Sequence, residues 1–479
     1  MSGIDTTAGG SFDSALDRPP ENSIGSDGRA RAPGPTYQEI ILKDSSPPPD
    51  AFLLSSYEFI GDQDIPYSRY TSAEFAEAEY EHLWPKVWQM ACREEHIPEE
   101  GDYHVYDVGT LSAIVTRQAD GRIKAFVNAC MHRGTALKDP ESEGFCDNFR
   151  CPFHGWIYSL DGVLIDVPED WDFPHVGADS HRLREAQVGT WAGFVFINFD
   201  PDAESLESFL GDLPEHFKNF GIENRYIETH VKKRLPVNWK AAEEAFMEAY
   251  HVKETHAAGA DYSEPITTYD IFGDNVSRFI HTVGAPNPRM PVQPSEQELL
   301  QGMWGRRGPD QGNPEDCPEV PEGKTARDVY AEIVKASLGQ AYDQDFSDYS
   351  TALTLDSIEY FLFPNFFIFP GLSLPMAYRF RPDPQDPDFS YFDLYFLRPR
   401  HPEKEPPPPP VPLQLGVQDS YTLAEGLGRL GAVYDEDTDN MAAQTRGFKS
   451  SAKLGQTLGN YQEVRIRHLH KRVDDYLGS

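Results

Sequence analysis

This sequence predicts an α+β fold in two parts, with a small antiparallel β domain first and a larger domain of helices and antiparallel strands after it. Over about residues 85–200, short runs of aromatic and β-branched residues alternate with turns that contain Gly or Asp, which is typical of antiparallel strands. Beyond residue 200, segments with helical spacing of apolar residues occur beside long aromatic strands. A chain of 479 residues also exceeds what one hydrophobic core usually organises.

The first 55 residues are rich in Gly, Pro, Ser and Asp and contain few large apolar side chains. We expect a flexible arm over 1–55, either disordered or draped over the rest of the chain, because such a composition can form little core of its own. A helix with a cap at Thr71 or Ser72 follows, since apolar and aromatic residues recur there at helical spacing. We assign 56–200 to the first domain, with this helix leading into its strands.

The second domain is assigned to 201–479 and should hold a twisted antiparallel sheet covered by helices. Its expected strands are the aromatic segments IEYFLFPNFFIFPG, PMAYRFRP and SYFDLYFLRP, and its expected helices include LESFLGDLPEHFKNFG and WKAAEEAFMEAYHV. An acidic insertion rich in Pro and Gly interrupts this domain at about 283–326. A stiff polyproline linker over 403–413 precedes the last helices.

Composition and charge exclude several classes of protein. The formal net charge of −36 argues against a nucleic-acid binder, because such proteins neutralise phosphate with a basic surface. The sequence has no apolar run long enough to predict a membrane span, and the N-terminus MSGIDTTAGG lacks the features of a secretory signal, so we expect a cytoplasmic protein. The five cysteines do not form a disulfide framework, whereas cysteines close to histidines indicate metal binding.

Two cysteines and two histidines form the first candidate metal site. One residue separates Cys130 from His132, eighteen residues follow, and two residues separate Cys151 from His154. Each pair ends an expected strand and is followed by Gly, so two similar loops can close on one metal centre. Two thiolates suit one iron of a [2Fe–2S] cluster, and two imidazoles suit the other. The alternative is a structural zinc site, which usually pairs Cys with Cys and His with His.

The segments CMHRG and CPFHGW resemble the two halves of a Rieske [2Fe–2S] motif. The resemblance implies that Cys130 and Cys151 bind one iron and that His132 and His154 bind the other. The spacer between the two halves is slightly long and contains Cys146, which we interpret as a free thiol rather than a ligand.

A Rieske domain alone could belong to an electron carrier, and the segment NWKAAEEAFMEAYHVKETH bears on this alternative. It resembles the iron-binding motif of the Rieske non-heme iron oxygenases, the ring-hydroxylating alpha subunits, with Ala245 where many members have Asn. The resemblance implies that His251 and His256 bind a mononuclear Fe(II). Such oxygenases hold iron with two imidazoles and one carboxylate and leave open positions for O2. The five-residue step between the histidines suits a regular helix poorly, so we expect a helix break or a π-type bulge between them.

The third iron ligand must come from elsewhere in the sequence. The segment AVYDEDTDNMAAQTRG resembles the family region in which a short acidic cluster precedes a helix, and alignment on its Asn-Met pair makes Asp437 the ligand. The rivals are Asp435, Glu436 and Asp439. Acidic residues in such a run are also favoured at a helix N-terminus by the helix dipole.

Glu248 lies three residues before His251 and is the candidate for coupling the two metal centres. The resemblance implies a homotrimer, with or without a β subunit, in which the cluster of one chain lies next to the iron of its neighbour. Glu248 would then hydrogen-bond His154 across that boundary. The alternatives for Glu248 are a brace for His251 or a solvated helix residue.

The resemblance covers about residues 60–450 and implies a terminal oxygenase that hydroxylates an organic substrate with O2. Electrons would come from NAD(P)H through a reductase, with or without a ferredoxin. An aromatic or otherwise hydrophobic substrate is expected, because several apolar residues could line a pocket. These residues are Phe246, Met247, Phe363, Phe366 and Phe367. Ring dihydroxylation, monohydroxylation and demethylation share the same ligands and stay open, as do a Rieske electron-transfer protein and a zinc-stabilised interaction module.

Overall fold

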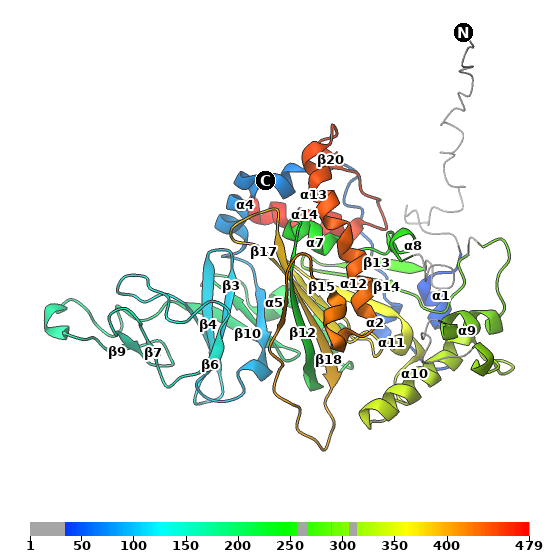
Figure 1. Ribbon diagram of the computed structural model, residues 1–479, viewed down its shortest axis with the longest axis horizontal. Coiled ribbons are helices and arrows are strands. Elements are labelled where there is room, and N and C mark those ends of the chain that lie inside the picture. Colours follow the sequence, from blue (N-terminus) through cyan, green and yellow to red (C-terminus); the bar gives the residue numbers. More distant parts are fainter. Residues whose placement is uncertain (1–33, 257–265, 289, 306–313, 479) are drawn as a thin grey trace, which may run out of the picture.

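The computed structural model describes residues 34–256, 266–288, 290–305 and 314–478. Within these ranges the predicted α+β class is confirmed, with two large sheets packed against each other and helices around the second (Figure 1). Phe194 and Phe196 of the first domain contact Phe366 of the second, with ring centroids 4.9 and 5.6 Å apart. One continuous apolar core therefore joins the two domains.

The first domain is built from a seven-stranded antiparallel sheet in the order β2-β11-β10-β5-β4-β3-β6 and a three-stranded sheet in the order β7-β8-β9. The strands of the larger sheet are β2 (Gln89–Arg93), β3 (Asp102–Val108), β4 (Leu111–Arg117), β5 (Ile123–Val127), β6 (Glu143–Phe145), β10 (Glu185–Trp191) and β11 (Phe194–Asn198). The smaller sheet contains β7 (Phe149–Arg150), β8 (Ile157–Tyr158) and β9 (Leu164–Asp166). Figure 1 shows this smaller sheet at the left end of the molecule, away from the second domain.

The second domain is organised by an eight-stranded sheet in the order β13-β14-β15-β16-β17-β18-β12-β19. Its strands are β12 (Arg225–Leu235), β13 (Thr267–Phe272), β14 (Val276–His281), β15 (Ser357–Leu362), β16 (Phe366–Ile368), β17 (Met376–Pro382), β18 (Ser390–Pro399) and β19 (Leu413–Leu415). All neighbours pair antiparallel except β12 and β19, which are parallel. Every residue of β14 and β17 is buried.

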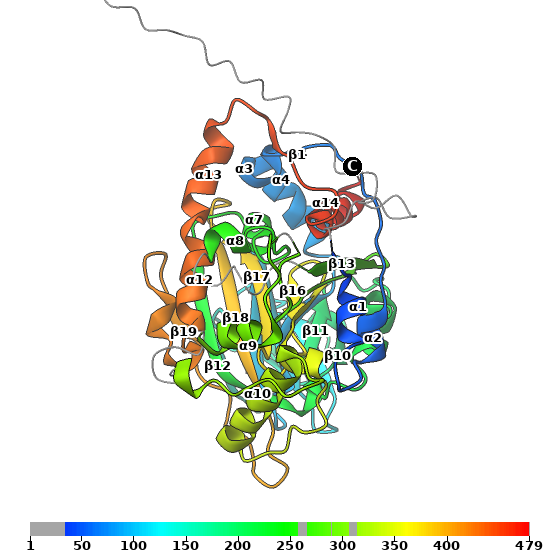
Figure 2. The ribbon, with the colours of Figure 1, turned by 90° about the vertical axis from the view of Figure 1, so that its right-hand side faces the viewer.

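Helices from distant parts of the sequence surround the candidate iron site. They are α7 (Trp239–Glu244), α8 (Val252–Thr255), α12 (Leu430–Asp439), α13 (Met441–Ser450) and α14 (Val464–Leu477). Figure 2 shows α12 and α13 in succession along one side of the molecule, with α7 and α8 beside them. The insertion expected at 283–326 contains α9 (Glu296–Gly305) and leads into α10 (Ala326–Tyr342) and α11 (Thr351–Leu355). None of the helices in the described ranges is both long and apolar enough to cross a membrane.

The part of the expected arm that the structure describes is folded against the second domain. Residues 1–33 lie outside the described residues, but α1 (Tyr37–Ile41) and α2 (Asp50–Leu53) pack on the second domain. Tyr37, Ile41 and Phe52 are buried, and Arg278 donates hydrogen bonds to the carbonyls of Ala51 and Leu54. Sparse apolar residues suffice here because they fill an existing core instead of building one of their own.

The helix expected before the first domain is capped at Ser72, whose side chain accepts a hydrogen bond from the backbone of Phe75. It consists of α4 (Ala73–Ala78) and a π-helical turn over Glu79–Leu83. Trp84, just beyond the turn, packs edge-on against Trp239 of α7, with ring centroids 4.9 Å apart. The segment that leads into the first domain thus packs against the second, and we propose that the first domain begins near β2.

Candidate metal centres

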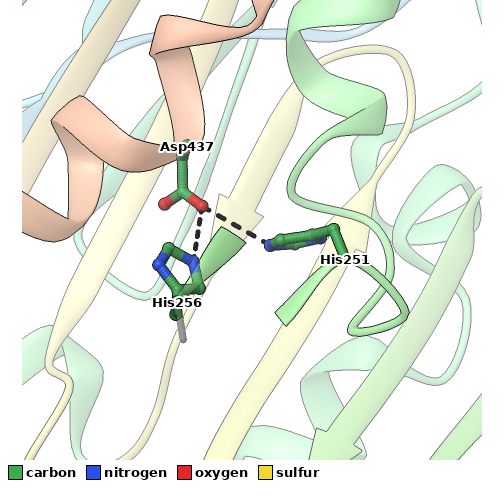
Figure 3. Close-up of side chains that lie close together, drawn as sticks. All are labelled: His251, His256 and Asp437. Atoms are coloured by element: carbon green, nitrogen blue, oxygen red, sulfur yellow. Dashed lines mark ion pairs between the residues drawn. The ribbon is translucent and has the colours of Figure 1, made fainter. Parts of the chain in front are cut away.

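His251, His256 and Asp437 form a compact triad, although Asp437 is far from the two histidines in sequence. One potential ligand atom from each of the three lies within 4.8 Å of the others, and no other such group of His, Cys, Asp or Glu occurs in the ranges that the structure describes. Asp437 Oδ1 lies 2.8 Å from His256 Nε2 and 3.4 Å from His251 Nε2 (Figure 3). Two imidazoles and one carboxylate that converge in this way match the facial triad of non-heme iron sites.

The break in the helix lies before His251 and not between the histidines, so that part of our expectation is wrong. The helix of the NWK segment ends at Glu244, and one separate helical turn, α8, connects His251 to His256. Two contacts hold the intervening loop, because Tyr269 Oη accepts from the backbone of Ala249 at 3.1 Å and Arg465 donates to the carbonyl of Met247 at 2.9 Å. A single turn with the two histidines at its ends brings their ring centroids to 5.5 Å.

A second carboxylate contacts each histidine on the nitrogen that faces away from Asp437. His251 Nδ1 donates to Glu248 Oε1 at 2.7 Å, and His256 Nδ1 donates to Glu436 Oε2 at 2.7 Å. Such outer carboxylates fix the tautomer and orientation of a metal-binding imidazole, because a proton held on Nδ1 leaves the lone pair on Nε2 free. Sequence reasoning named Glu436 as a rival ligand and missed this contact.

The other two acidic rivals have different surroundings. Asp435 accepts a hydrogen bond from the backbone of Tyr421 at 2.9 Å and lies 3.8 Å from Lys233 Nζ. Asp439 is exposed to solvent. Among the four carboxylates of this run, Asp437 alone faces both histidines through Nε2.

The charges of the triad stabilise one another. Burial alone would lower the pKa of His251, but hydrogen bonds with Asp437 and Glu248 raise it to about 10. Burial would raise the pKa of Asp437, but the hydrogen bonds from the two histidines outweigh it and hold this pKa below its ordinary value. The triad therefore favours a positive charge between the two rings and the carboxylate. A divalent cation that displaces the ring protons would supply this charge.

A pocket of about 420 Å³ opens beside the triad. Its walls combine carboxylates with apolar side chains. The carboxylates are Glu244, Glu248, Asp437 and Glu463, and the apolar residues include Met441, Leu458 and Ile466. The apolar residues expected to line a substrate pocket are not in the walls of this pocket. Phe246 packs against Phe380 and Phe392, and Phe363 stacks on Tyr476.

The four predicted cluster ligands lie on two matching loops. The amide of Gly134 donates to the carbonyl of Cys130 at 2.9 Å, and the amide of Gly155 donates to the carbonyl of Cys151 at 3.1 Å. Both glycines have positive φ angles, of 77° and 75°, which residues with a side chain rarely adopt. Each loop thus turns back within two residues of its histidine.

The side chains on these loops converge in a way that fits a Rieske cluster. Cys130 and Cys151 are buried in the apolar core of the first domain, and the rings of His132 and His154 lie 4.6 Å apart. His132 Nδ1 is buried and has no hydrogen-bond partner among the described residues, as expected for an atom that binds iron. Mixed Cys and His ligands of this kind suit a [2Fe–2S] cluster with two thiolates on one iron.

Two aromatic residues complete the surroundings of the cluster ligands. Tyr158 Oη lies 3.3 Å from Cys130 Sγ and accepts a hydrogen bond from the backbone of Met131. Trp156 stacks on His132 at 4.9 Å with the two planes 8° apart. Sequence reasoning did not single out Tyr158, although it lies four residues beyond His154 in the same segment.

Comparisons with known proteins agree with this geometry. The family model for the catalytic domain of the ring-hydroxylating alpha subunit matches residues 221–479, and the model for the Rieske [2Fe–2S] domain matches residues 87–175. The large subunit of anthranilate 1,2-dioxygenase from Acinetobacter baylyi is 34% identical over 199 residues, which are 39% of this chain and 41% of that protein. The glycine betaine monooxygenase oxygenase subunit from Pseudomonas aeruginosa is 29% identical over 196 residues, which are 40% of this chain and 44% of that protein.

These alignments span about two fifths of the length of the curated relatives. The fold extends further, because a structure of naphthalene 1,2-dioxygenase matches 88% of this chain and 94% of its own with a TM-score of 0.61 at 19% identity. The catalytic-domain model covers more than half of the chain and includes all three residues of the triad. The chain belongs to the ring-hydroxylating alpha subunit family.

Proposed function

We propose that this chain is the terminal oxygenase of a multicomponent Rieske system. Cys130, His132, Cys151 and His154 would hold a [2Fe–2S] cluster, and His251, His256 and Asp437 would hold a mononuclear Fe(II). The observation that carries the proposal is the convergence of both Nε2 atoms on Asp437 in a chain that also has a preformed pair of Cys/His loops. When bound, the cluster supplies single electrons and the iron supplies O2 activation.

The residues of the chain would position and tune these groups. Glu248 holds the ring of His251 through Nδ1, and Asp437 lies between the two rings with 9% of its side chain exposed. Trp156 covers one face of His132 and keeps water from it. Burial of the two cysteines excludes solvent from the thiolates, and solvent exposure is one of the factors that set the reduction potential of such a cluster.

We also propose that electrons pass between chains of a homotrimer. In Figure 1 the strands β7 and β9 beside the cluster loops lie at the left end of the molecule, whereas α8 and α12 lie on the other side of the central sheet. His154 is exposed, and Glu248 lines the open pocket beside the triad, so each could meet its counterpart on a neighbouring chain. A reductase fed by NAD(P)H, with or without a ferredoxin, would reduce the cluster, and a β subunit is compatible with this arrangement.

Two roles are open to Glu248 in this proposal. It can bridge to His154 of a neighbouring chain, or it can brace His251. Its Oε1 accepts from His251 Nδ1, and its Oε2 accepts from the backbone amides of Tyr250 and His251, which supports a brace for His251. A carboxylate oxygen can accept a second hydrogen bond. Oε1 can therefore brace His251 and still accept the ring N–H of the partner's His154.

Glu248→Gln separates coupling from bracing. Because Gln keeps an oxygen for His251 Nδ1, we expect both metals and a reducible cluster to persist, while electron passage from the cluster to the iron slows strongly in a single turnover. Rapid-quench product formation and the reoxidation rate of the cluster measure this. A normal rate in the variant contradicts the bridge, and loss of mononuclear iron alone supports the brace.

The substrate we propose is aromatic or otherwise hydrophobic. The curated relatives are named for anthranilate and for glycine betaine, so both an aromatic ring and a methylated amine are within the chemistry of similar proteins. The pocket beside the triad supports the first, because Met441, Leu458 and Ile466 place apolar surface in its wall. Monooxygenation or demethylation of a non-aromatic substrate is the second candidate.

A single-turnover experiment with ¹⁸O2 tests the function without the physiological reductase. Dithionite-reduced protein is mixed with ¹⁸O2 and a panel that contains anthranilate, biphenyl and glycine betaine, and products are identified by mass spectrometry. We expect labelled product from the wild type and none from Asp437→Ala, which should lose mononuclear iron yet keep its Rieske spectrum. Asp439→Asn is the matched control and should behave as the wild type. Iron analysis that finds cluster iron alone in the wild type would instead identify an electron-transfer protein.

A further inference from the structure

We propose that Glu436 is a positioning residue that holds His256 by its outer nitrogen and thereby builds half of the metal site. The inference rests on the proposed iron-binding function. In the sequence, Glu436 was a rival of Asp437 for the role of iron ligand. Here it is assigned the different role of orienting a ligand. The contact joins two side chains of this chain, so it does not need a bound metal in order to form.

Helix α12 contacts both nitrogens of the same imidazole ring. Glu436 Oε2 lies 2.7 Å from His256 Nδ1, and Asp437 Oδ1 lies 2.8 Å from His256 Nε2. Two consecutive residues of one helix thus enclose the ring of His256 between their carboxylates. A carboxylate on Nδ1 keeps the proton there, which leaves the Nε2 lone pair directed at the position next to Asp437.

Among the residues that the structure describes, more contacts support the position of His251 than that of His256. The outer partner of His251 is Glu248, three residues earlier in the same loop, and that loop is tied to Tyr269 and Arg465. His256 ends the single turn of α8, and its backbone amide donates to the carbonyl of Val252. The ring of His256 therefore takes its orientation from a helix that is 180 residues away in sequence.

Contacts with neighbouring segments hold helix α12 in place, so this helix can orient the ring of His256. Asp435 accepts from the backbone of Tyr421, and Tyr434 Oη lies 2.6 Å from Tyr378 Oη of β17. The neighbouring carboxylates of one acidic run thus perform different tasks. Asp435 anchors the helix, Glu436 orients His256, and Asp437 faces both rings. Asp439 is exposed, which makes it a control of equal charge on the same helix.

Metal affinity of the cluster-loaded protein tests the inference without an activity assay. Protein stripped of mononuclear metal by mild chelation, with its Rieske absorbance retained, is titrated anaerobically with Fe(II) and in parallel with Co(II), whose absorption bands report ligand geometry. We expect Glu436→Ala to bind Fe(II) about 10- to 100-fold more weakly. Glu436→Gln should lose less, because its amide oxygen still accepts from Nδ1. Asp439→Asn should bind within about 2-fold of the wild type.

The outcomes distinguish this inference from the proposed function. Glu436 is half exposed, with 49% of its side chain accessible, so both substitutions should leave the fold intact, as the Rieske spectrum and the melting temperature report. Equal affinity and equal Co(II) bands for Glu436→Ala and the wild type, with Asp437→Ala unable to bind, would overturn the role of Glu436 alone. Failure of the wild type to bind Fe(II) or Co(II) at this site would overturn the proposed function and this inference with it.

Discussion

Asp437 is distinguished from its acidic neighbours by its position relative to two distant histidines and not by its chemical type. Four carboxylates occur between residues 435 and 439, and each has different surroundings in the folded chain. Alignment on the following Asn-Met pair points to Asp437, and the structure brings this residue together with His251 and His256. Its role as an iron ligand stays a prediction that the Asp437→Ala experiment addresses.

Tyr158 is a residue whose effect can be measured on the cluster itself. Its hydroxyl accepts from the backbone of Met131, which leaves its proton directed at Cys130 Sγ, 3.3 Å away. A hydrogen bond to a cluster thiolate stabilises the reduced, more negative state, so Tyr158→Phe should lower the midpoint potential. The expected change is about 40 mV, which corresponds to roughly 1 kcal/mol for one hydrogen bond.

Redox titration followed by EPR measures this shift in potential. Cys146→Ser is the control, because Cys146 is expected to be a free thiol and its replacement should leave both the cluster and its potential unchanged. A Tyr158→Phe potential equal to that of the wild type would mean that the hydroxyl does not donate to Cys130. Loss of the cluster in Cys151→Ser but not in Cys146→Ser would support the assignment of ligands.

At the scale of elements, the C-terminal helix α14 supports the loop that carries Glu248 and His251. Arg465 is fully buried, pairs with Glu359 of β15 at 2.8 Å and donates to the carbonyl of Met247. His470, further along the same helix, lies 2.8 Å from Glu244 at the end of α7. Nothing in the local sequence of α14 indicates that it contacts the metal-binding segment.

Removal of the Arg465 side chain should therefore lower the free energy of unfolding. It should also weaken the support of the loop that carries Glu248 and His251. Arg465→Met leaves Glu359 buried without its partner, and we expect a loss of about 3–5 kcal/mol in the free energy of unfolding. The double variant Arg465→Met/Glu359→Met should recover part of this loss, because the unpaired buried charge is gone. Thermal melting of the four proteins in the cycle measures the coupling, and strictly additive losses would contradict it.

Lys471→Met provides a control on the same helix. Lys471 pairs with Glu58, the two side chains are 45% and 54% exposed, and such pairs contribute at most about 1 kcal/mol. A loss from Lys471→Met as large as that from Arg465→Met would show that α14 is sensitive to any lost side chain. The loss expected for Arg465→Met could then not be attributed to the buried Arg465–Glu359 pair.

At the scale of the whole molecule, buried charged side chains hold the two domains together through hydrogen bonds. Asp393 of β18 lies 3.0 Å from both Arg379 and Arg381. Arg379 also donates to the carbonyls of Met90 and Ala91 in the first domain. Burial would raise the pKa of Asp393, but the two guanidinium groups outweigh it and hold this pKa well below its ordinary value. The orientation of the first domain is thus set by directed hydrogen bonds as well as by apolar packing.

Acid should destabilise this assembly, because several buried histidines have lowered pKa values. Burial is the main cause for each of them, and it lowers the pKa of His468 to about 4. The others are His96, His216, His230 and His470. Between pH 4 and the ordinary histidine pKa of about 6.5, the unfolded chain binds protons that the folded chain does not. Stability is therefore highest above that window and falls as the pH is lowered, by up to about 1.4 kcal/mol per pH unit for each such histidine.

Melting temperatures recorded through this pH range check the prediction. His468→Gln should show a shallower decline toward low pH than the wild type, since one proton fewer is taken up on unfolding. His82→Gln is the control, because the His82 side chain is 41% exposed and should leave the slope unchanged. An identical slope in His468→Gln and the wild type would mean that His468 is protonated in the folded state.

The sequence by itself determined the features that depend on neighbours in the chain. Runs of aromatic and β-branched residues between turns, together with helical spacing of apolar residues, predicted the α+β class, because strand and helix periods are local properties. The Cys/His loops and the histidine pair were likewise identified by short spacings, since a loop of a few residues leaves its side chains little freedom to diverge.

The tertiary structure decided the features that depend on contacts between distant segments. It placed the helix break before His251, because Tyr269 and Arg465 hold the preceding loop. It buried α1 and α2 of the expected arm on a core that residues far along the chain supply. It also gave each carboxylate of one acidic run a separate partner. These outcomes arise from packing and charge pairing across hundreds of residues, which no local pattern of residue types encodes.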